Sequence, residues 1–177
     1  MRSSNSPKPR VGISACLLGE PVRYDGGDKR DPCITDTLAD CFEWLPVCPE
    51  VGAGLGVPRP PVKLVAESGQ LLALGVDNPS LDVTDALESF SRAWLEELSD
   101  LSGFILKSRS PSCGLHDTLR FDAQGEEQGR GDGLFTRILI QCYPHLPVED
   151  ENGIHDPVRR KRFISRVLTY AQENKAI

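Results

Sequence analysis

The chain of 177 residues is predicted to form a single compact α/β domain, a three-layer Rossmann-like fold with a mainly parallel sheet. Three short apolar runs, at Val11–Ala15, Leu45–Val47 and Phe104–Leu106, have the length and composition of buried strands. Segments with helical periodicity separate these runs, and loop residues follow each run at once. This order is typical of a parallel sheet whose binding loops lie at its carboxyl edge.

Composition indicates where this predicted domain begins. Residues 1–10 are polar, contain two prolines and have no apolar run, so we expect a disordered N-terminal arm and no secretory signal. Residues 11–177 form the predicted domain, whose size allows about 70% of the unfolded surface to be buried without disulfides. No run reaches transmembrane length, so we expect a cytoplasmic protein with reduced thiols and no membrane partner.

The region between the first two predicted strands contains a long loop and a predicted helix. Glycine, aspartate and proline are concentrated in residues 19–32, which excludes regular structure there. A helix is predicted over Thr35–Trp44, because Leu38, Ala39 and Phe42 would share one helical face. The strand at residues 45–47 would follow it directly.

The middle of the chain is predicted to contain a loop, a hairpin and a helix. Residues 52–61 contain three glycines and three prolines and are therefore a loop. Val62–Ala66 and Leu71–Leu74, separated by Glu-Ser-Gly-Gln, are typical of the two strands of a hairpin. The clearest helix is predicted over Val83–Leu98, where apolar residues recur every three or four positions.

The last third begins with the third predicted strand and its loop, residues 108–116. Residues 119–133 are glycine-rich and charged, which indicates a surface ribbon or loop. Leu134–Tyr143 is apolar on one side and predicted to be helical. A final helix over Pro157–Ala171 would present five apolar residues to the body of the domain: Phe163, Ile164, Val167, Leu168 and Ala171.

Three of the six cysteines, Cys16, Cys48 and Cys113, follow the three predicted strands. Because neighbouring parallel strands end at one edge of a sheet, we expect the three thiols to meet there. Soft thiolates select zinc, copper(I) or iron–sulfur clusters, and three without an obvious fourth ligand leave a coordination position open. The alternative is that they are ordinary buried thiols at strand ends.

The remaining cysteines and histidines are weaker candidates. No pair of cysteines forms Cys-x-x-Cys, so zinc-finger and thioredoxin-like sites lack their usual pattern. Core packing is the better interpretation of Cys41 and Cys142, whereas Cys33 is the first choice for a spare ligand. His116, three residues after Cys113, could complete a Cys3His zinc site.

Glu50, Lys107 and Ser108 are the candidate catalytic residues. Glu50 comes two residues after Cys48, where its carboxylate could serve as a general base, although a surface or capping glutamate is the alternative. Ser108 could present its hydroxyl to a substrate, or it could only shape a turn. Lys107 could offset the charge of a thiolate-ligated group, or it could be solvated.

Three motifs together resemble the thiouracil desulfidase (TudS) family, formerly a domain of unknown function. They are Ser-Ala-Cys-Leu-Leu-Gly at 14–19, Cys-Pro-Glu-Val at 48–51 with Pro-Arg-Pro-Pro after it, and Leu-Lys-Ser-Arg-Ser-Pro-Ser-Cys-Gly at 106–114. The resemblance covers roughly residues 11–147. It implies an α/β domain with cluster-binding loops that hold a [4Fe-4S] cluster by three cysteines, which map to Cys16, Cys48 and Cys113, and leave one iron open.

The resemblance also implies an enzyme of the carbon–sulfur hydrolase type. Such a [4Fe-4S]-dependent thiouracil or thiouridine desulfidase removes sulfur from a thiolated pyrimidine without net electron transfer, giving the oxo-pyrimidine and sulfide. Glu50 would activate the water, and Lys107 or Ser108 would assist proton transfer or orientation. The substrate would be a small thiopyrimidine or thiolated nucleoside, with thiolated tRNA as a larger candidate, and the protein would be a monomer or weak homodimer.

A non-catalytic binding module is the alternative from another functional class. In this interpretation a structural Cys3His zinc site shapes the loops, and the basic stretch Arg159–Arg162 contacts RNA. Four adjacent charges point around a helix and not to one side, which favours a solvated face. The formal net charge of −6 also argues against a general nucleic-acid binder.

Overall fold

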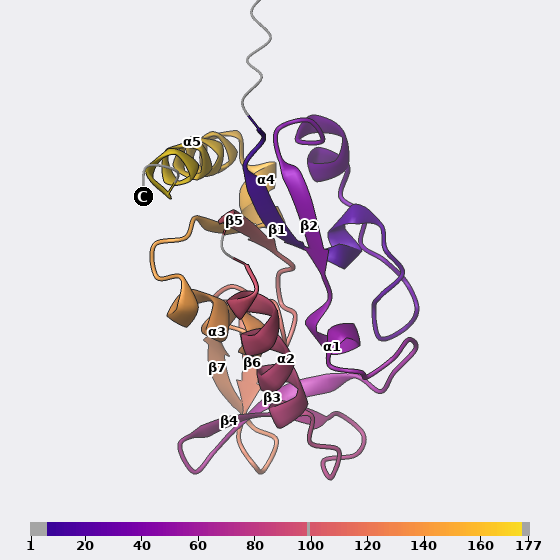
Figure 1. Ribbon diagram of the computed structural model, residues 1–177. Helices are drawn as coiled ribbons and strands as arrows, with labels where there is room; N and C mark the ends of the chain where they lie inside the picture. Colours follow the sequence, from indigo (N-terminus) through magenta and orange to yellow (C-terminus); the bar gives the residue numbers. More distant parts are fainter. Residues whose placement is uncertain (1–6, 99, 175–177) are drawn as a thin grey trace, which may run out of the picture.

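The computed structural model describes residues 7–98 and 100–174 (Figure 1). Most of the predicted N-terminal arm, residues 1–6, lies outside this part of the chain. Its last residue, Arg10, already belongs to the first strand. Among the described residues, no helix has both the length and the apolar character needed to cross a membrane.

A four-stranded parallel sheet carries the fold. Its strands are β1 (Arg10–Ser14), β2 (Glu43–Val47), β5 (Leu101–Leu106) and β8 (Val148–Asp150), in the order β2-β1-β5-β8. Every neighbouring pair in this sheet is parallel. The three predicted strands are therefore adjacent in space, and the predicted α/β class with a mainly parallel sheet is confirmed. The strand β8 was not predicted.

A second four-stranded sheet is drawn at the bottom of Figure 1, below the first. It is made of two antiparallel pairs joined by a parallel contact between β3 and β6. The strands are β3 (Val62–Glu67), β4 (Gln70–Gly75), β6 (Thr118–Phe121) and β7 (Glu127–Gly131). Both the predicted hairpin and the predicted surface ribbon are present. Ser68 and Gly69 join β3 to β4 with φ of 51° and 80°, as a two-residue hairpin turn of type I′ requires.

Helices cover both faces of the parallel sheet. On one face lie two short turns, η1 (Ala15–Leu18) and η2 (Cys33–Thr37), with α4 (Glu151–His155) and α5 (Pro157–Asn174). On the other face α2 (Thr84–Glu96) and α3 (Leu134–Cys142) pack against each other and against the sheet. The side chains of β5 alternate accordingly, because Ile105 joins the first apolar core and Phe104 and Leu106 join the second.

The prediction of a helix over Thr35–Trp44 is wrong. The chain makes only the π-helical turn η2 and then enters β2 at Glu43. Strand pairing accounts for the difference, because Glu43 lies opposite Arg10 and the parallel register continues from there along all of β2. Ala39, expected on the buried helical face, is exposed.

The other predicted helices are present, with small changes at their ends. The helices α2, α3 and α5 occupy the segments with helical periodicity, and residues 19–31 contain no helix or strand. In α5, Phe163, Val167 and Ala171 are buried as expected, whereas Leu168 remains 46% exposed. A short helix that was not predicted, α1 (Pro49–Gly52), ends at the first residue of the predicted glycine-rich loop.

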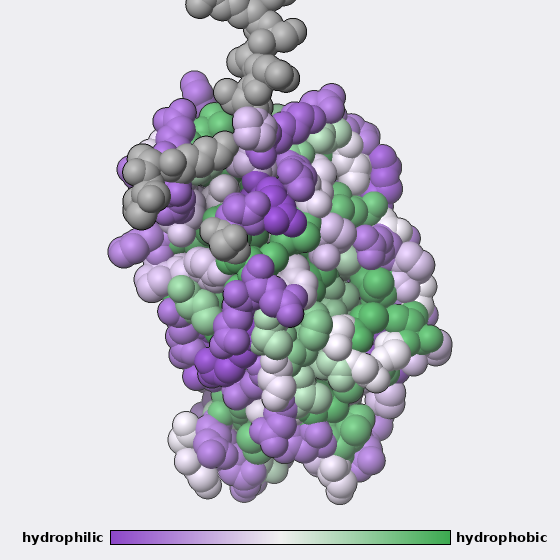
Figure 2. Space-filling view, in the orientation of Figure 1, coloured by the Kyte–Doolittle hydropathy of each residue, from purple (hydrophilic) through white to green (hydrophobic). Residues whose placement is uncertain are grey.

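The surface mixes hydrophilic and apolar residues. In the view of Figure 2, hydrophilic residues dominate the upper part and apolar residues gather across the middle and right. In the described part of the chain, the large apolar residues that are exposed are Tyr24, Val57, Val76, Val158 and Leu168. Two of these, Tyr24 and Val57, belong to the loops at residues 19–32 and 53–61.

Gly12 on β1 allows close packing against the second apolar core. A Cβ at this position would overlap with the ring of Phe104, which is fully buried and in aromatic contact with Phe135 and Trp94. We expect Gly12→Ala to lower the free energy of unfolding by about 1–3 kcal/mol, because the ring has no free space to move into. Urea denaturation followed by circular dichroism measures the change.

A second-site variant separates this clash from a general effect on the strand. Phe104→Leu removes two of the three ring atoms that the new methyl group meets, Cε2 and Cζ. The double variant Gly12→Ala/Phe104→Leu should therefore be less destabilised than the sum of the two single variants. Strict additivity would show that the Gly12–Phe104 contact does not limit the substitution.

Candidate active site

One cavity of about 480 Å³ opens at the carboxyl edge of the parallel sheet. Its lining comes mainly from the segments that follow β1, β2 and β5, with the loops at residues 22–29 and 59–62 forming the other walls. All six predicted site residues line it: Cys16, Cys48, Glu50, Lys107, Ser108 and Cys113. The strand order explains this assembly, because three adjacent parallel strands deliver their following loops to the same edge.

Three cysteines reach the cavity from three separate elements. Cys16 lies in η1 directly after β1, Cys48 precedes α1, and Cys113 lies in the loop between β5 and β6. Cys16 and Cys113 are buried, and Cys48 is partly buried. Within the described residues, no group of three or more His, Cys, Asp or Glu side chains is arranged to hold a single metal ion. The thiols therefore surround the cavity without crowding around one point.

Burial controls the protonation of these thiols. It raises the pKa of Cys16 to about 11 and also raises the pKa of Cys48. Burial likewise raises the pKa of Cys113 well above its ordinary value, and the proximity of Cys48 and Cys16 adds to the effect. The three thiols are thus close enough to influence one another electrostatically, and a metal centre would have to displace their protons.

Glu50 presents a fixed carboxylate at the same cavity. Arg59 Nε donates to Glu50 Oε2 at 2.7 Å, and Ser112 Oγ donates to Glu50 Oε1 at 2.8 Å. The side chains of Arg59 and Glu50 are only 4% and 12% exposed. Each carboxylate oxygen has one partner and keeps a further lone pair, so Glu50 can still accept a proton from a bound molecule.

Arg59 is a site residue that the sequence did not reveal. Besides its ion pair with Glu50, its Nη1 donates to the carbonyl oxygens of Val22 and Gly56, both at 2.9 Å. Its Nη2 lies 3.8 Å from Cys48 Sγ. One buried guanidinium therefore joins two loops, a carboxylate and a thiol. The only signal in the sequence was its place in Pro-Arg-Pro-Pro, which does not distinguish a buried arginine from a solvated one.

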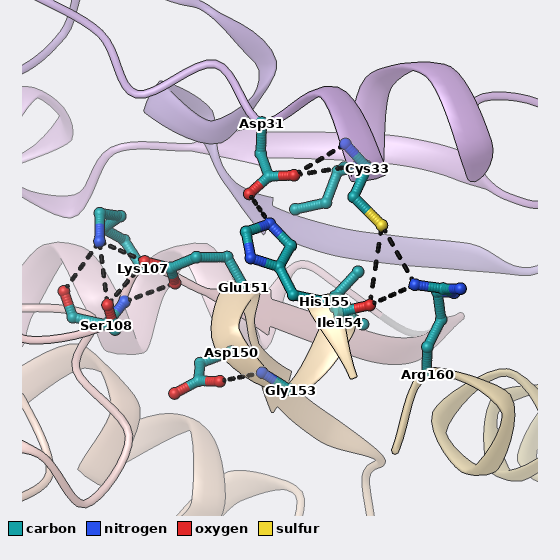
Figure 3. A network of polar contacts seen from close by, with 11 residues as sticks. Asp31, Cys33, Lys107, Ser108, Asp150, Glu151, Gly153, Ile154, His155 and Arg160 are labelled. Carbon is teal, nitrogen blue, oxygen red and sulfur yellow. Dashed lines mark hydrogen bonds and ion pairs between the residues drawn. The ribbon is translucent and has the colours of Figure 1, made fainter. Parts of the chain in front are cut away.

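Lys107 and Ser108 share a third residue that was also missed, Glu151 at the start of α4 (Figure 3). Ser108 donates to its carboxylate twice, from Oγ to Oε1 at 2.6 Å and from the backbone N to Oε2 at 2.8 Å. Lys107 Nζ donates to Glu151 Oε1 and, at 3.0 Å, to Ser108 Oγ. Burial raises the pKa of Glu151, but the hydrogen bonds from Lys107 and Ser108 outweigh it and the net pKa is lowered.

The structure does not bring His116 or Cys33 to this cavity. The side chain of His116 is 74% exposed, and its Nδ1 lies 2.7 Å from Asp132 Oδ1. Cys33 Sγ lies near Arg160 Nη1 at 3.3 Å and the Ile154 carbonyl oxygen at 3.7 Å (Figure 3). The Cys3His alternative therefore lacks its histidine, and Cys33 is not a spare ligand here.

Two other expectations about cysteines are corrected. Cys41 and Cys142 were expected in the core, but both are exposed. Cys41 follows η2 in a segment that never becomes a helix, so the helical pattern that would have buried it is absent. Cys142 is the last residue of α3, beyond the part of that helix that packs against the sheet.

Cations surround the cavity. Arg23, Lys29 and Arg109 line it together with Arg59 and Lys107. The Arg23 guanidinium also lies over the ring of Tyr24, at 5.6 Å from its centroid. Although the whole chain is acidic, this cavity is suited to an electron-rich or negatively charged group.

Comparison with known proteins agrees with this arrangement. The profile of the 2-thiouracil desulfurase family matches residues 11–151, which include the three cysteines, Glu50 and Glu151. The uncharacterized protein YbbK of Bacillus subtilis (strain 168) is 31% identical over 156 residues, covering 81% of this chain and 97% of YbbK.

A solved structure has the same fold. The [4Fe-4S]-dependent thiouracil desulfidase TudS superposes with a TM-score of 0.65 at 31% identity, over 82% of this chain and 92% of TudS. The family profile covers most of the chain and every element that lines the cavity, as the three sequence motifs predicted. The chain belongs to the 2-thiouracil desulfurase family.

Proposed function

We propose that the protein is a [4Fe-4S]-dependent desulfidase that hydrolyses a thiolated pyrimidine of the thiouracil or thiouridine type. The products are the oxo-pyrimidine and sulfide, and no net electron transfer takes place. One observation carries this proposal: three cysteines from neighbouring strands and a buried carboxylate share a single cavity. Family membership and the similarity to TudS support it.

The residues at the cavity fit an iron–sulfur cluster. Cys16, Cys48 and Cys113 would hold it, since thiolates are the usual ligands of such clusters. Their spacing around a cavity suits a group with several metal atoms, and the nearby Arg59 and Lys107 would offset the charge of the thiolates. When bound, a [4Fe-4S] cluster with three cysteine ligands supplies an open iron that acts as a Lewis acid toward the thiocarbonyl sulfur.

Glu50 would act as the general base. Arg59 stabilises its negative charge, and both carboxylate oxygens keep a lone pair for a water molecule. Glu50 takes one proton from this water as the oxygen bonds to the ring carbon that carries sulfur. When the carbon–sulfur bond breaks, Glu50 returns this proton to the departing sulfur, and the second proton of the water leaves the added hydroxyl for the solvent as the carbonyl forms. One water is consumed, and the pyrimidine gains oxygen as it loses sulfide.

The proposal also includes the substrate class, the oligomeric state and the cellular compartment. The substrate is a small thiopyrimidine or thiolated nucleoside, because the cavity of about 480 Å³ can enclose a pyrimidine ring. Thiolated tRNA is the larger alternative. The protein works in the cytoplasm as a monomer or weak homodimer.

Activity can be tested directly with a panel of small substrates. Protein purified without oxygen and reconstituted with iron and sulfide should convert 2-thiouracil, 4-thiouracil or their nucleosides to the oxo form. Sulfide and oxo-pyrimidine should appear in equal amounts, measured by methylene blue formation and by chromatography. If cluster-loaded protein releases no sulfide from any member of the panel, the proposed function is wrong.

Ligand assignment is tested by removing each cysteine. Cys16→Ala, Cys48→Ala and Cys113→Ala should each lose the iron and acid-labile sulfide of the reconstituted protein, because two thiolates do not retain the cluster. Cys33→Ala and Cys142→Ala are matched controls, since neither residue lines the cavity, and both should keep full iron content. An intact cluster in any variant of the first group would remove that cysteine from the ligand set.

The role of Glu50 is tested by Glu50→Gln. The amide keeps the size of the side chain but cannot take a proton, so turnover should fall at least about 100-fold while the iron content stays unchanged. Glu20→Gln, an exposed glutamate in the loop at residues 19–32, serves as the matched control. Turnover of Glu50→Gln within a few-fold of the original protein would show that another group activates the water.

A further inference from the structure

Glu151 is the only acidic side chain that contacts both Lys107 and Ser108 among the described residues, and it comes from a distant part of the chain (Figure 3). It lies 43 residues after Ser108, at the first position of α4. Its carboxylate accepts three hydrogen bonds from these two residues. Lys107 and Ser108 line the cavity, whereas Glu151 lies behind them. Hydrogen bonding by Glu151 therefore reaches a bound molecule only through its two partners.

The ammonium group of Lys107 donates hydrogen bonds to acceptors within the protein. It has three N–H bonds to donate and no lone pair. Three acceptors surround it: Glu151 Oε1, Ser108 Oγ at 3.0 Å and the Ser108 carbonyl oxygen at 3.2 Å. Lys107 thus contributes a fixed positive charge near the cavity, and its ammonium group is directed toward these acceptors.

The hydroxyl of Ser108 has a defined direction for the same reason. An ionised carboxylate can only accept, so the single Ser108 hydroxyl proton points to Glu151 Oε1 at 2.6 Å. Lys107 can only donate, so it occupies one of the two lone pairs of Ser108 Oγ. One lone pair remains. Any contact that Ser108 Oγ makes with a molecule in the cavity therefore uses it as a hydrogen-bond acceptor and not as a donor.

The backbone of α4 holds Glu151 in place. The Asp150 side chain accepts a hydrogen bond from Gly153 N at 2.7 Å and caps this short helix. At its other end, His155 Nε2 lies 2.7 Å from the buried Asp31 Oδ2, and Arg160 Nη1 donates to the Ile154 carbonyl oxygen at 2.9 Å (Figure 3). These contacts fix both ends of α4, so the position of the Glu151 carboxylate is defined before a ligand binds.

We infer that Glu151 is a positioning residue that turns Ser108 into an acceptor for the N3–H group of the pyrimidine substrate. This inference rests on the proposed function. N3–H is the ring donor that 2-thio and 4-thio pyrimidines share, as free bases and as nucleosides, and it is adjacent to the thiocarbonyl carbon in each. An acceptor at Ser108 would hold that carbon in a constant place whichever of these substrates binds.

Methylated substrates test the acceptor. Protein loaded with the cluster should desulfurise 1-methyl-2-thiouracil, which keeps N3–H, at least about 100-fold more efficiently in kcat/KM than 3-methyl-2-thiouracil, which lacks it. Uracil should likewise bind in calorimetry at least about 10-fold more tightly than 3-methyluracil. A methyl group could also be rejected for its size alone, so Ser108→Ala is measured beside the original protein. Loss of the acceptor should reduce both ratios to within about threefold of unity.

Glu151→Gln tests the positioning role. An amide nitrogen can donate to Ser108 Oγ and reverse its hydroxyl, so KM for 2-thiouracil should rise about 10-fold or more while kcat changes less. In the Ser108→Ala background the same substitution should have no further effect on KM, because Glu151 acts through Ser108. Glu149→Gln is the matched control: Glu149 pairs with Arg159 and does not line the cavity, so both constants should stay unchanged.

The outcomes separate this inference from the proposed function. If the original protein releases sulfide from 2-thiouracil but treats the two methylated compounds alike, the acceptor role of Ser108 is wrong. If Glu151→Gln raises KM equally with and without Ser108, Glu151 does not act through it. Iron analysis and thermal unfolding of each variant show whether cluster content or folding has changed. Absence of sulfide release from every thiopyrimidine overturns the proposed function itself.

Discussion

The parallel pairing of β1 with both β2 and β5 is the constraint on which the rest of the structure depends. It brings the ends of three strands, distant in sequence, to one edge of the sheet. The loops that follow carry Cys16, Cys48 and Cys113, so a shift in this pairing would separate the thiols. Gly12 has a part in the same constraint, since only a residue without a side chain lets β1 lie against the ring of Phe104.

Two buried ion pairs complete the cavity. Arg59 with Glu50 and Lys107 with Glu151 place charges where solvent hardly reaches. Removing such charges from water costs several kcal/mol for each ion, and the cost is offset only where the geometry is good and the remaining hydrogen-bonding groups are satisfied. Both pairs meet that condition, because Ser112 and Ser108 add hydrogen bonds to the carboxylates. Both charged pairs can therefore be kept at the cavity, away from solvent.

Much of the fold could be predicted from the sequence. The six predicted site residues could also be identified, and all of them line the cavity. Short apolar runs revealed β1, β2 and β5, and their order placed the cysteines at one edge. The strand β8 was missed because Val148–Asp150 contains a single apolar residue. The helix over residues 35–44 failed because local periodicity does not report the pairing of Glu43 with β1. Arg59 and Glu151 were missed because polar contacts between distant segments leave no periodic pattern.

The hydrogen bonds of Arg59 to two loops limit how far the cavity can open or close. Its guanidinium binds the carbonyl oxygens of Val22 and Gly56, on segments that approach from different strands. Separating these segments would break the hydrogen bond to Val22 and loosen the charge partner of Glu50. Arg59 thus links the loops that line the cavity, and the cavity is preformed and does not need to close over a ligand. Its dipoles are already oriented before a ligand arrives, so little reorganisation is required during the reaction.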